Sequence, residues 1–155
     1  MKLCRLGNIG KEKPAIIDNQ NNYRDLSSEV DDLNPNTLNF ELIEKIKKLE
    51  ILKLPILDKN QRIGACVSNP SKFIGIGLNF KDHATEQNLP IPKEPIIFSK
   101  FTNSVCGPND DIAIPKNSNH TDWEVELGFV IGKKAKYISE AEAIDHVLGF
   151  FLVND

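Results

Sequence analysis

The stretch Asp122-Trp123-Glu124-Val125-Glu126-Leu127-Gly128-Phe129-Val130-Ile131-Gly132 decides how the second half of the chain is interpreted. Its apolar residues recur with the period of two that is typical of a β-strand, in which successive side chains point to opposite faces. One unbroken apolar face results, and we expect it to be buried: Trp123, Val125, Leu127, Phe129 and Ile131. Glu124 and Glu126 share the other face, roughly 6.5–7 Å apart along the strand.

Two interpretations of the glutamate face remain open at this point. Carboxylates at that spacing repel one another, so inside a cleft they need a counter-charge, and a hard divalent cation with oxygen ligands supplies one. The alternative is an ordinary solvated face, because antiparallel sheets often keep one face in water. The strand alone favours the solvated face, and the rest of the sequence has to decide.

Composition and charge exclude several classes of protein. The chain has 155 residues, of which 40% are hydrophobic and 26% charged, as in soluble globular proteins. A net charge of −3 without a Lys/Arg cluster argues against nucleic-acid binding, and no apolar run approaches the ~20 residues of a membrane span. Cys4, Cys66 and Cys106 lack metal-ligand spacing and indicate free thiols, and the first residues lack the long apolar core expected of a signal peptide. These features predict a cytoplasmic protein.

Residues 1–70 are expected to form a small N-terminal α/β accessory module. Short strands are predicted over residues 2–6, 15–18 and 23–26. An amphipathic helix is predicted over residues 38–49, with Asn36 or Thr37 as its N-cap. The run Asn69-Pro70-Ser71 is the predicted domain boundary.

Residues 71–155 are expected to be rich in strands. Strands are predicted over residues 73–78, 95–101, 111–114, 122–132 and 147–153, with a short helix over 80–87. Ser139-Glu140-Ala141-Glu142 is a capping box that predicts one or two helical turns. The predicted fold class is therefore α+β and β-rich.

His83 and Glu86 are three residues apart on the predicted short helix and therefore share one helix face. A histidine held by a carboxylate is suited to general-base catalysis, because its pKa lies near neutrality. The alternative is an ordinary surface pair, which is more common for such a spacing. His120, in a polar loop before the glutamate strand, is a further candidate ligand or a solvated side chain.

Several separated motifs, in the correct order, resemble the first half of the catalytic domain of the fumarylacetoacetate hydrolase family. They are Ile76-Gly77-Leu78-Asn79-Phe80-Lys81-Asp82-His83, Glu94-Pro95-Ile96-Ile97-Phe98-Ser99-Lys100, Gly107-Pro108, Asp122-Trp123-Glu124-Val125-Glu126-Leu127, Val130-Ile131-Gly132-Lys133, and Leu148-Gly149-Phe150 with Asn154-Asp155. Ser99 and Phe101 depart locally from the family pattern. The resemblance implies that residues 71–155 form part of a mixed β-roll or barrel that this chain leaves incomplete.

The resemblance also implies roles for individual residues. Glu124, Glu126 and Asp155 match three carboxylate ligands of Mg²⁺, with Mn²⁺ or Ca²⁺ as alternatives. His83 and Glu86 match a dyad on a mobile lid helix that activates water, and Lys100 matches a lysine near the site. With these positions in the family's order, a divalent-cation site becomes the favoured interpretation of the glutamate strand.

The implied activity is Mg²⁺-dependent hydrolysis of a C–C bond in a 2-oxo or 2,4-dioxo acid of the acylpyruvate type, by a homodimeric enzyme. Two alternatives stay open: an isomerase or lyase on the same scaffold, such as one resembling ureidoglycolate lyase, and a non-catalytic fragment or interaction module. Family members continue beyond the Asn-Asp motif, so we expect a truncated chain with weak or no activity. The third expected ligand, Asp155, is the last residue of the sequence.

Overall fold

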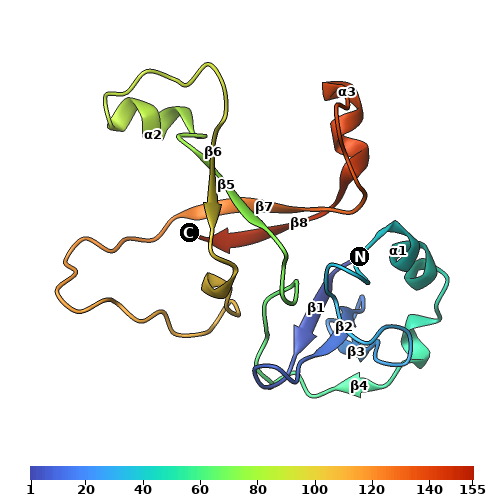
Figure 1. Ribbon diagram of the computed structural model, residues 1–155. Coiled ribbons are helices and arrows are strands. Elements are labelled where there is room, and N and C mark those ends of the chain that lie inside the picture. Colours follow the sequence, from blue (N-terminus) through green and yellow to red (C-terminus); the bar gives the residue numbers. More distant parts are fainter. The chain divides into compact units, whose positions relative to one another are not determined.

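The computed structural model describes residues 1–155 and consists of three small antiparallel sheets with short helices (Figure 1). The chain divides into two compact units, Met1–Ser68 together with Cys106–Asp155, and Asn69–Val105. The predicted β-rich α+β class is confirmed, and no sheet closes into a barrel. No helix combines the length and the apolar character that crossing a membrane requires.

A four-stranded antiparallel sheet forms the N-terminal part of the first unit, in the order β1-β2-β3-β4. Its strands are β1 (Leu3–Leu6), β2 (Lys13–Ile17), β3 (Tyr23–Asp25) and β4 (Ile56–Leu57). Two clusters of buried side chains accompany it: Ile16, Leu26, Leu33, Leu42 and Ile46 in one, and Cys4, Leu6 and Ala15 in the other. This module therefore has a hydrophobic core of its own.

The helix α1 (Phe40–Lys47) buries Leu42 and Ile46 against this core, and a 3₁₀ turn, η1 (Ile51–Lys53), follows it. The prediction of Asn36 or Thr37 as its N-cap is wrong. Asn39 is the cap, because its side-chain oxygen accepts a hydrogen bond from the backbone N–H of Leu42 at 2.9 Å.

The second unit consists of β5 (Phe73–Gly77), α2 (Lys81–Glu86), β6 (Ile96–Lys100) and η2 (Thr102–Ser104). β5 and β6 pair in antiparallel register, so that Gly75 lies opposite Phe98. Ala84 of α2 is buried, whereas Ile74 and Ile97 of the two strands are exposed. The strands and the helix predicted here are present, each within two residues of its expected ends.

A long hairpin of β7 (Val125–Ile131) and β8 (Val147–Asn154) belongs to the first unit. α3 (Glu140–Ala143) and η3 (Ile144–His146) connect its strands, and the predicted capping box of Ser139 and Glu142 is present. The strand predicted over residues 111–114 is absent, because no neighbouring strand pairs with this segment.

The expected burial of the apolar face of β7 is wrong for this chain. Trp123 is 72% exposed and Leu127 62% exposed. β7 pairs with β8 alone, and Leu127 and Phe129 lie opposite Leu152 and Phe150, which are themselves exposed. The alternation therefore identified one apolar face correctly, but no other element of the chain covers it.

Candidate metal centre

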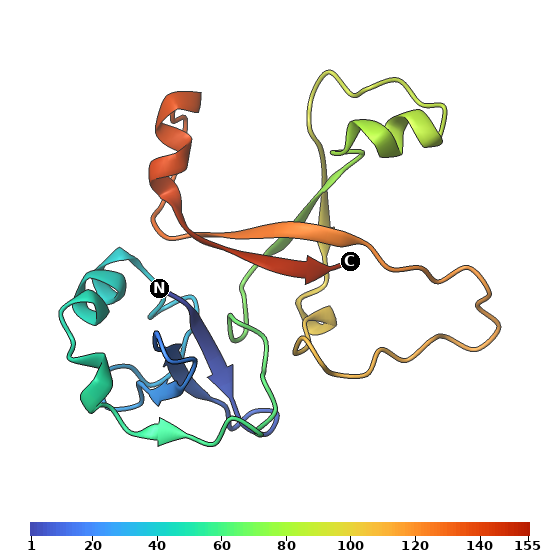
Figure 2. The same cartoon turned by 180° about the vertical axis from the view of Figure 1, so that it is seen from behind.

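The antiparallel register of β7 and β8 brings the three predicted carboxylates together. Asn154 lies opposite Val125, and the backbone N–H of Asp155 donates to the carbonyl oxygen of Glu124 at 2.9 Å. The side-chain oxygen of Asn154 accepts a hydrogen bond from the N–H of Glu124 at 3.0 Å, which fixes the start of the hairpin. Asp155 is thus the cross-strand neighbour of Glu124, and Glu126 follows on the same face. Figure 2 shows the C-terminus beside the beginning of β7.

One oxygen atom from each of Glu124, Glu126 and Asp155 lies within 4.8 Å of the others. Opposite oxygen ligands of a six-coordinate ion are ~4.2 Å apart for Mg²⁺ and ~4.6–5.2 Å apart for Ca²⁺, by the usual bond lengths. The 4.8 Å limit is close to these spans, so the cluster has the size of one coordination sphere. Glu124 is exposed, whereas Glu126 and Asp155 are half-buried.

The chemistry of this cluster fits a hard divalent cation. All three donors are carboxylate oxygens, which Mg²⁺, Mn²⁺ and Ca²⁺ prefer over nitrogen and sulfur. No ion pair within the chain neutralises Glu124 or Glu126. His120 is exposed and is not a member of the cluster.

His83 and Glu86 lie on α2, in the second unit, as the sequence predicted. His83 is half-buried and Glu86 exposed, and neither a hydrogen bond nor an ion pair joins their side chains. Lys100 is the last residue of β6 and is half-buried. The carboxylate cluster and these three residues belong to different units, and each group is described by itself.

A network of partly buried charges, which the sequence did not reveal, joins segments far apart in the chain. Arg62 donates through Nη1 to Glu12 at 2.8 Å and through Nε to Asp110 at 2.6 Å. Arg5 donates to Asp32 at 2.6 Å and forms an ion pair with Glu12 at 3.3 Å. The hydrogen bond to Asp110 raises the pKa of Arg62, and the same bond lowers the pKa of Asp110. A separation of 48 residues between Arg62 and Asp110 leaves no local signal for this pair.

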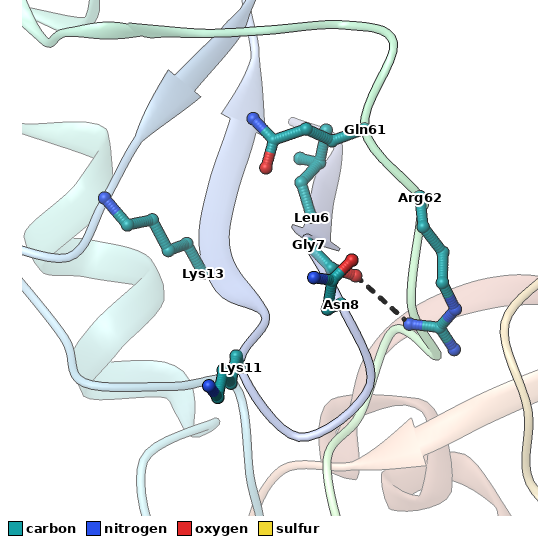
Figure 3. A pocket seen from close by; sticks show the side chains of 7 residues that line it. All are labelled: Leu6, Gly7, Asn8, Lys11, Lys13, Gln61 and Arg62. Carbon is teal, nitrogen blue, oxygen red and sulfur yellow. Dashed lines mark hydrogen bonds between the residues drawn. The ribbon is translucent and has the colours of Figure 1, made fainter.

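A shallow pocket of about 360 Å³ lies beside this network. Its lining residues are Leu6, Gly7, Asn8, Lys11, Lys13, Gln61 and Arg62 (Figure 3). Arg62 also donates to the carbonyl oxygen of Gly7 there, and Lys13 is paired with Asp25 at 3.0 Å. Two of its three cations therefore already have protein partners, which makes the pocket a poor anion site.

The fold and the cluster define a protein with a carboxylate-lined candidate site for a divalent cation on a β-hairpin. The sequence profile of the family described as "Fumarylacetoacetate (FAA) hydrolase C-terminal" matches residues 72–155. The chain belongs to this family, whose members generally use a divalent metal ion.

Curated relatives and solved structures agree with this assignment. Proteins of Burkholderia orbicola and Burkholderia multivorans, both provisionally named as hydrolases, are each 52% identical over 155 residues. The chain matches the structure of a protein from Mycobacterium smegmatis, provisionally named HpcE, with 27% identity and a TM-score of 0.81. It matches the fold of a fumarylacetoacetate hydrolase from Exiguobacterium antarcticum with 24% identity and a TM-score of 0.70.

Each of these comparisons covers all of the chain but 55% of the relative. The chain thus spans about half the length of the curated relatives and solved structures that it matches.

Proposed function

We propose that this chain carries the metal-binding part of a Mg²⁺-dependent hydrolase that cleaves a C–C bond in 2,4-dioxo acids of the acylpyruvate type. The observation that carries the proposal is the convergence of Glu124, Glu126 and Asp155 within 4.8 Å, in a chain of the fumarylacetoacetate hydrolase family. The proposal includes residues 71–155 as the first half of the catalytic domain, a small 2-oxo or 2,4-dioxo acid as the ligand, and a homodimer as the assembly.

Glu124, Glu126 and Asp155 would hold the ion through one oxygen each. When bound, the ion would act as a Lewis acid that polarises substrate oxygens and as a template that orients the substrate. Binding the ion would need no change in the backbone conformation of these residues, because the hairpin register already brings their oxygens together.

His83 is proposed as the general base, which takes a proton from the attacking water at an imidazole nitrogen. Glu86, three residues further along α2, would orient the imidazole ring. General-base catalysis of this kind contributes ~10²–10⁴-fold to a rate. Lys100 belongs to the proposed catalytic set through the family motif alone.

Tb³⁺ binding tests the metal site directly, because Trp123 lies next to Glu124 in the sequence and can sensitise the luminescence of a nearby lanthanide. We expect the wild-type chain to bind Tb³⁺, Mg²⁺ to displace it, and Glu126→Gln to weaken binding at least tenfold. Glu94→Gln, an exposed glutamate outside the cluster, is the matched control and should bind as the wild type does. Equal binding by the wild type and by Glu126→Gln would contradict the proposed metal site.

Cleavage of an acylpyruvate in the presence of Mg²⁺ tests the reaction itself. Any turnover by the wild-type chain should disappear in Glu124→Ala, and it should fall by ~10²–10⁴-fold in His83→Ala. His83→Ala should retain Tb³⁺ binding, since His83 is not a member of the cluster. Turnover that survives Glu124→Ala would overturn the proposed chemistry.

A further inference from the structure

The hairpin face that carries the three carboxylates also carries one large aromatic ring. In the antiparallel register, Phe151 of β8 lies opposite Gly128 of β7. The next pair on this face is Val153 with Glu126, and the one after it is Asp155 with Glu124. Residues two apart along a strand point to the same face, so Phe151 and Asp155 belong to one face, and so do Gly128 and Glu126. Phe151 is half-buried, as are Glu126 and Asp155.

The ring of Phe151 leans across the hairpin and lies over Gly128. A β-carbon built on Gly128 would lie 2.5 Å from Cε2 and 2.9 Å from Cε1 of this ring, too close for any side chain. Glycine in the middle of a strand often marks such a close approach. Gly128 thus lets the far end of the ring reach across to β7, about 7 Å along that strand from Glu126 by the strand rise.

We propose that Phe151, laid over Gly128, is the apolar wall of the ligand site and selects substrates by the apolar end of their acyl group. This inference rests on the proposed function. Binding sites for small molecules combine a few polar groups that fix orientation with apolar surface that contacts the rest of the ligand. The cation that the carboxylates would hold binds the oxygen-rich end of a 2,4-dioxo acid. Phe151 is the large apolar side chain nearest to them along that face of β8.

The same hairpin supplies a control for this role. Phe150 is the adjacent residue of β8, but it points to the opposite face, where it contacts Phe129 with ring centroids 6.5 Å apart. Phe150→Leu and Phe151→Leu remove the same ring from the same strand. They differ in whether the ring shares a face with Glu124, Glu126 and Asp155.

The test compares the affinities of the Mg²⁺-loaded chain for 2,4-dioxopentanoate and 2,4-dioxononanoate by calorimetry. We expect the wild type to prefer the longer acid and Phe151→Leu to reduce this preference about tenfold, as for a change of one methylene in an apolar pocket. Phe150→Leu should keep the preference. Gly128→Ala, which leaves Phe151 intact but displaces its ring, should reduce it as well, and Tb³⁺ binding should persist in all three variants.

Two failures can be told apart. If the wild type binds both acids but Phe151→Leu and Gly128→Ala keep its preference, Phe151 is not the wall, and the proposed function stands. If the wild type binds neither acid in the presence of Mg²⁺, the proposed function falls and this inference falls with it. Circular dichroism checks that each variant folds. If either Phe151→Leu or Gly128→Ala does not fold, the other one carries the test, because the first removes the ring and the second displaces it.

Discussion

Gly107 occupies a position where backbone and side chains of three segments meet. A β-carbon there would collide with the carbonyl oxygen of Ile63 and would lie 3.0 Å from Oδ2 of Asp110 and 3.1 Å from Nη2 of Arg62. The N–H of Gly107 also donates to Oδ2 of Asp110 at 2.6 Å. We therefore expect Gly107→Ala to lower the free energy of unfolding by about 1–3 kcal/mol, as overpacking of a tight site does.

Gly149 of β8 is the matched control for Gly107→Ala, because no atom lies within 4 Å of its would-be β-carbon. Gly149→Ala should leave stability unchanged within about 0.5 kcal/mol. Urea denaturation of both variants measures the difference. An equal effect of the two substitutions would show that the contacts around Gly107 do not constrain this residue.

Asp18 makes the stability of the N-terminal module depend on pH in the acidic range. Its carboxylate accepts hydrogen bonds from the N–H groups of Gln20 at 2.8 Å and Asn22 at 2.9 Å, and from Nε of Arg24 at 2.8 Å. Burial alone would raise the pKa of Asp18, but the hydrogen bonds from Asn22, Arg24 and Gln20 outweigh it and lower the pKa to about 2.

Because the folded pKa of Asp18 is depressed, its contribution to stability is full above the ordinary value of 3.8 and is lost as the pH falls towards about 2. Asp18→Asn should therefore be less stable at neutral pH and should show a shallower loss of stability between these two pH values. Urea denaturation at a series of pH values measures this slope. Asp31→Asn, at an exposed aspartate, should keep the wild-type slope.

Among the elements, α1 shows what determines which of several candidate residues becomes the N-cap of a helix. Asn36, Thr37 and Asn39 are all suitable caps by residue type. The hydroxyl of Thr37, however, donates to the carbonyl oxygen of Asp32 and accepts from the N–H of Asn34, so it serves the preceding turn. The sequence could predict the helix from its apolar spacing, but the first turn depended on hydrogen bonds that no spacing reveals.

Replacing the observed cap should destabilise the module, whereas replacing the predicted one should not. Asn39→Ala removes the hydrogen bond to the N–H of Leu42 and should cost about 1 kcal/mol. Asn36→Ala is the control, since Asn36 is exposed and its side chain forms no hydrogen bond. Thermal unfolding followed by circular dichroism compares them, and equal melting temperatures would contradict the role of Asn39.

Both strands of the β7–β8 hairpin were predicted from sequence, although their pairing with each other was not. Alternation over residues 122–132 and the run over 147–153 determine which side chains share a face, and antiparallel pairing then brings Glu124 and Asp155 together. No hydrogen bond or ion pair joins the side chains of His83 and Glu86, although their spacing places them on one face of α2. Spacing along a helix brings two side chains within reach, but solvent competes for both groups where one of them is exposed.

At the scale of the whole molecule, the burial of apolar side chains is uneven. Apart from Ala84, every fully buried apolar side chain lies within the first 46 residues. Residues 72–155 contain the family motifs, yet their strands leave large apolar side chains in contact with water. A sequence pattern predicts which face of a strand is apolar, but whether another element covers that face depends on tertiary partners that no local pattern encodes.

The exposed apolar face of the hairpin should be measurable in solution. We define this face as Val125, Leu127, Phe129, Ile131, Phe150 and Leu152, all exposed. Contiguous apolar surface of this kind binds hydrophobic dyes and favours self-association. Leu127→Lys, in the middle of the face, should therefore reduce both the fluorescence of bound anilinonaphthalene sulfonate and the sedimentation of large species.

Ile9→Lys is the matched control for Leu127→Lys, because Ile9 is 77% exposed but lies in a loop outside the hairpin. It adds the same charge and lowers hydropathy by a similar amount, so it corrects for the general effect of an added lysine on solubility. We expect dye binding by Ile9→Lys to equal that of the wild type. If the two variants reduce dye binding equally, charge alone explains the change, and the hairpin face is covered in solution.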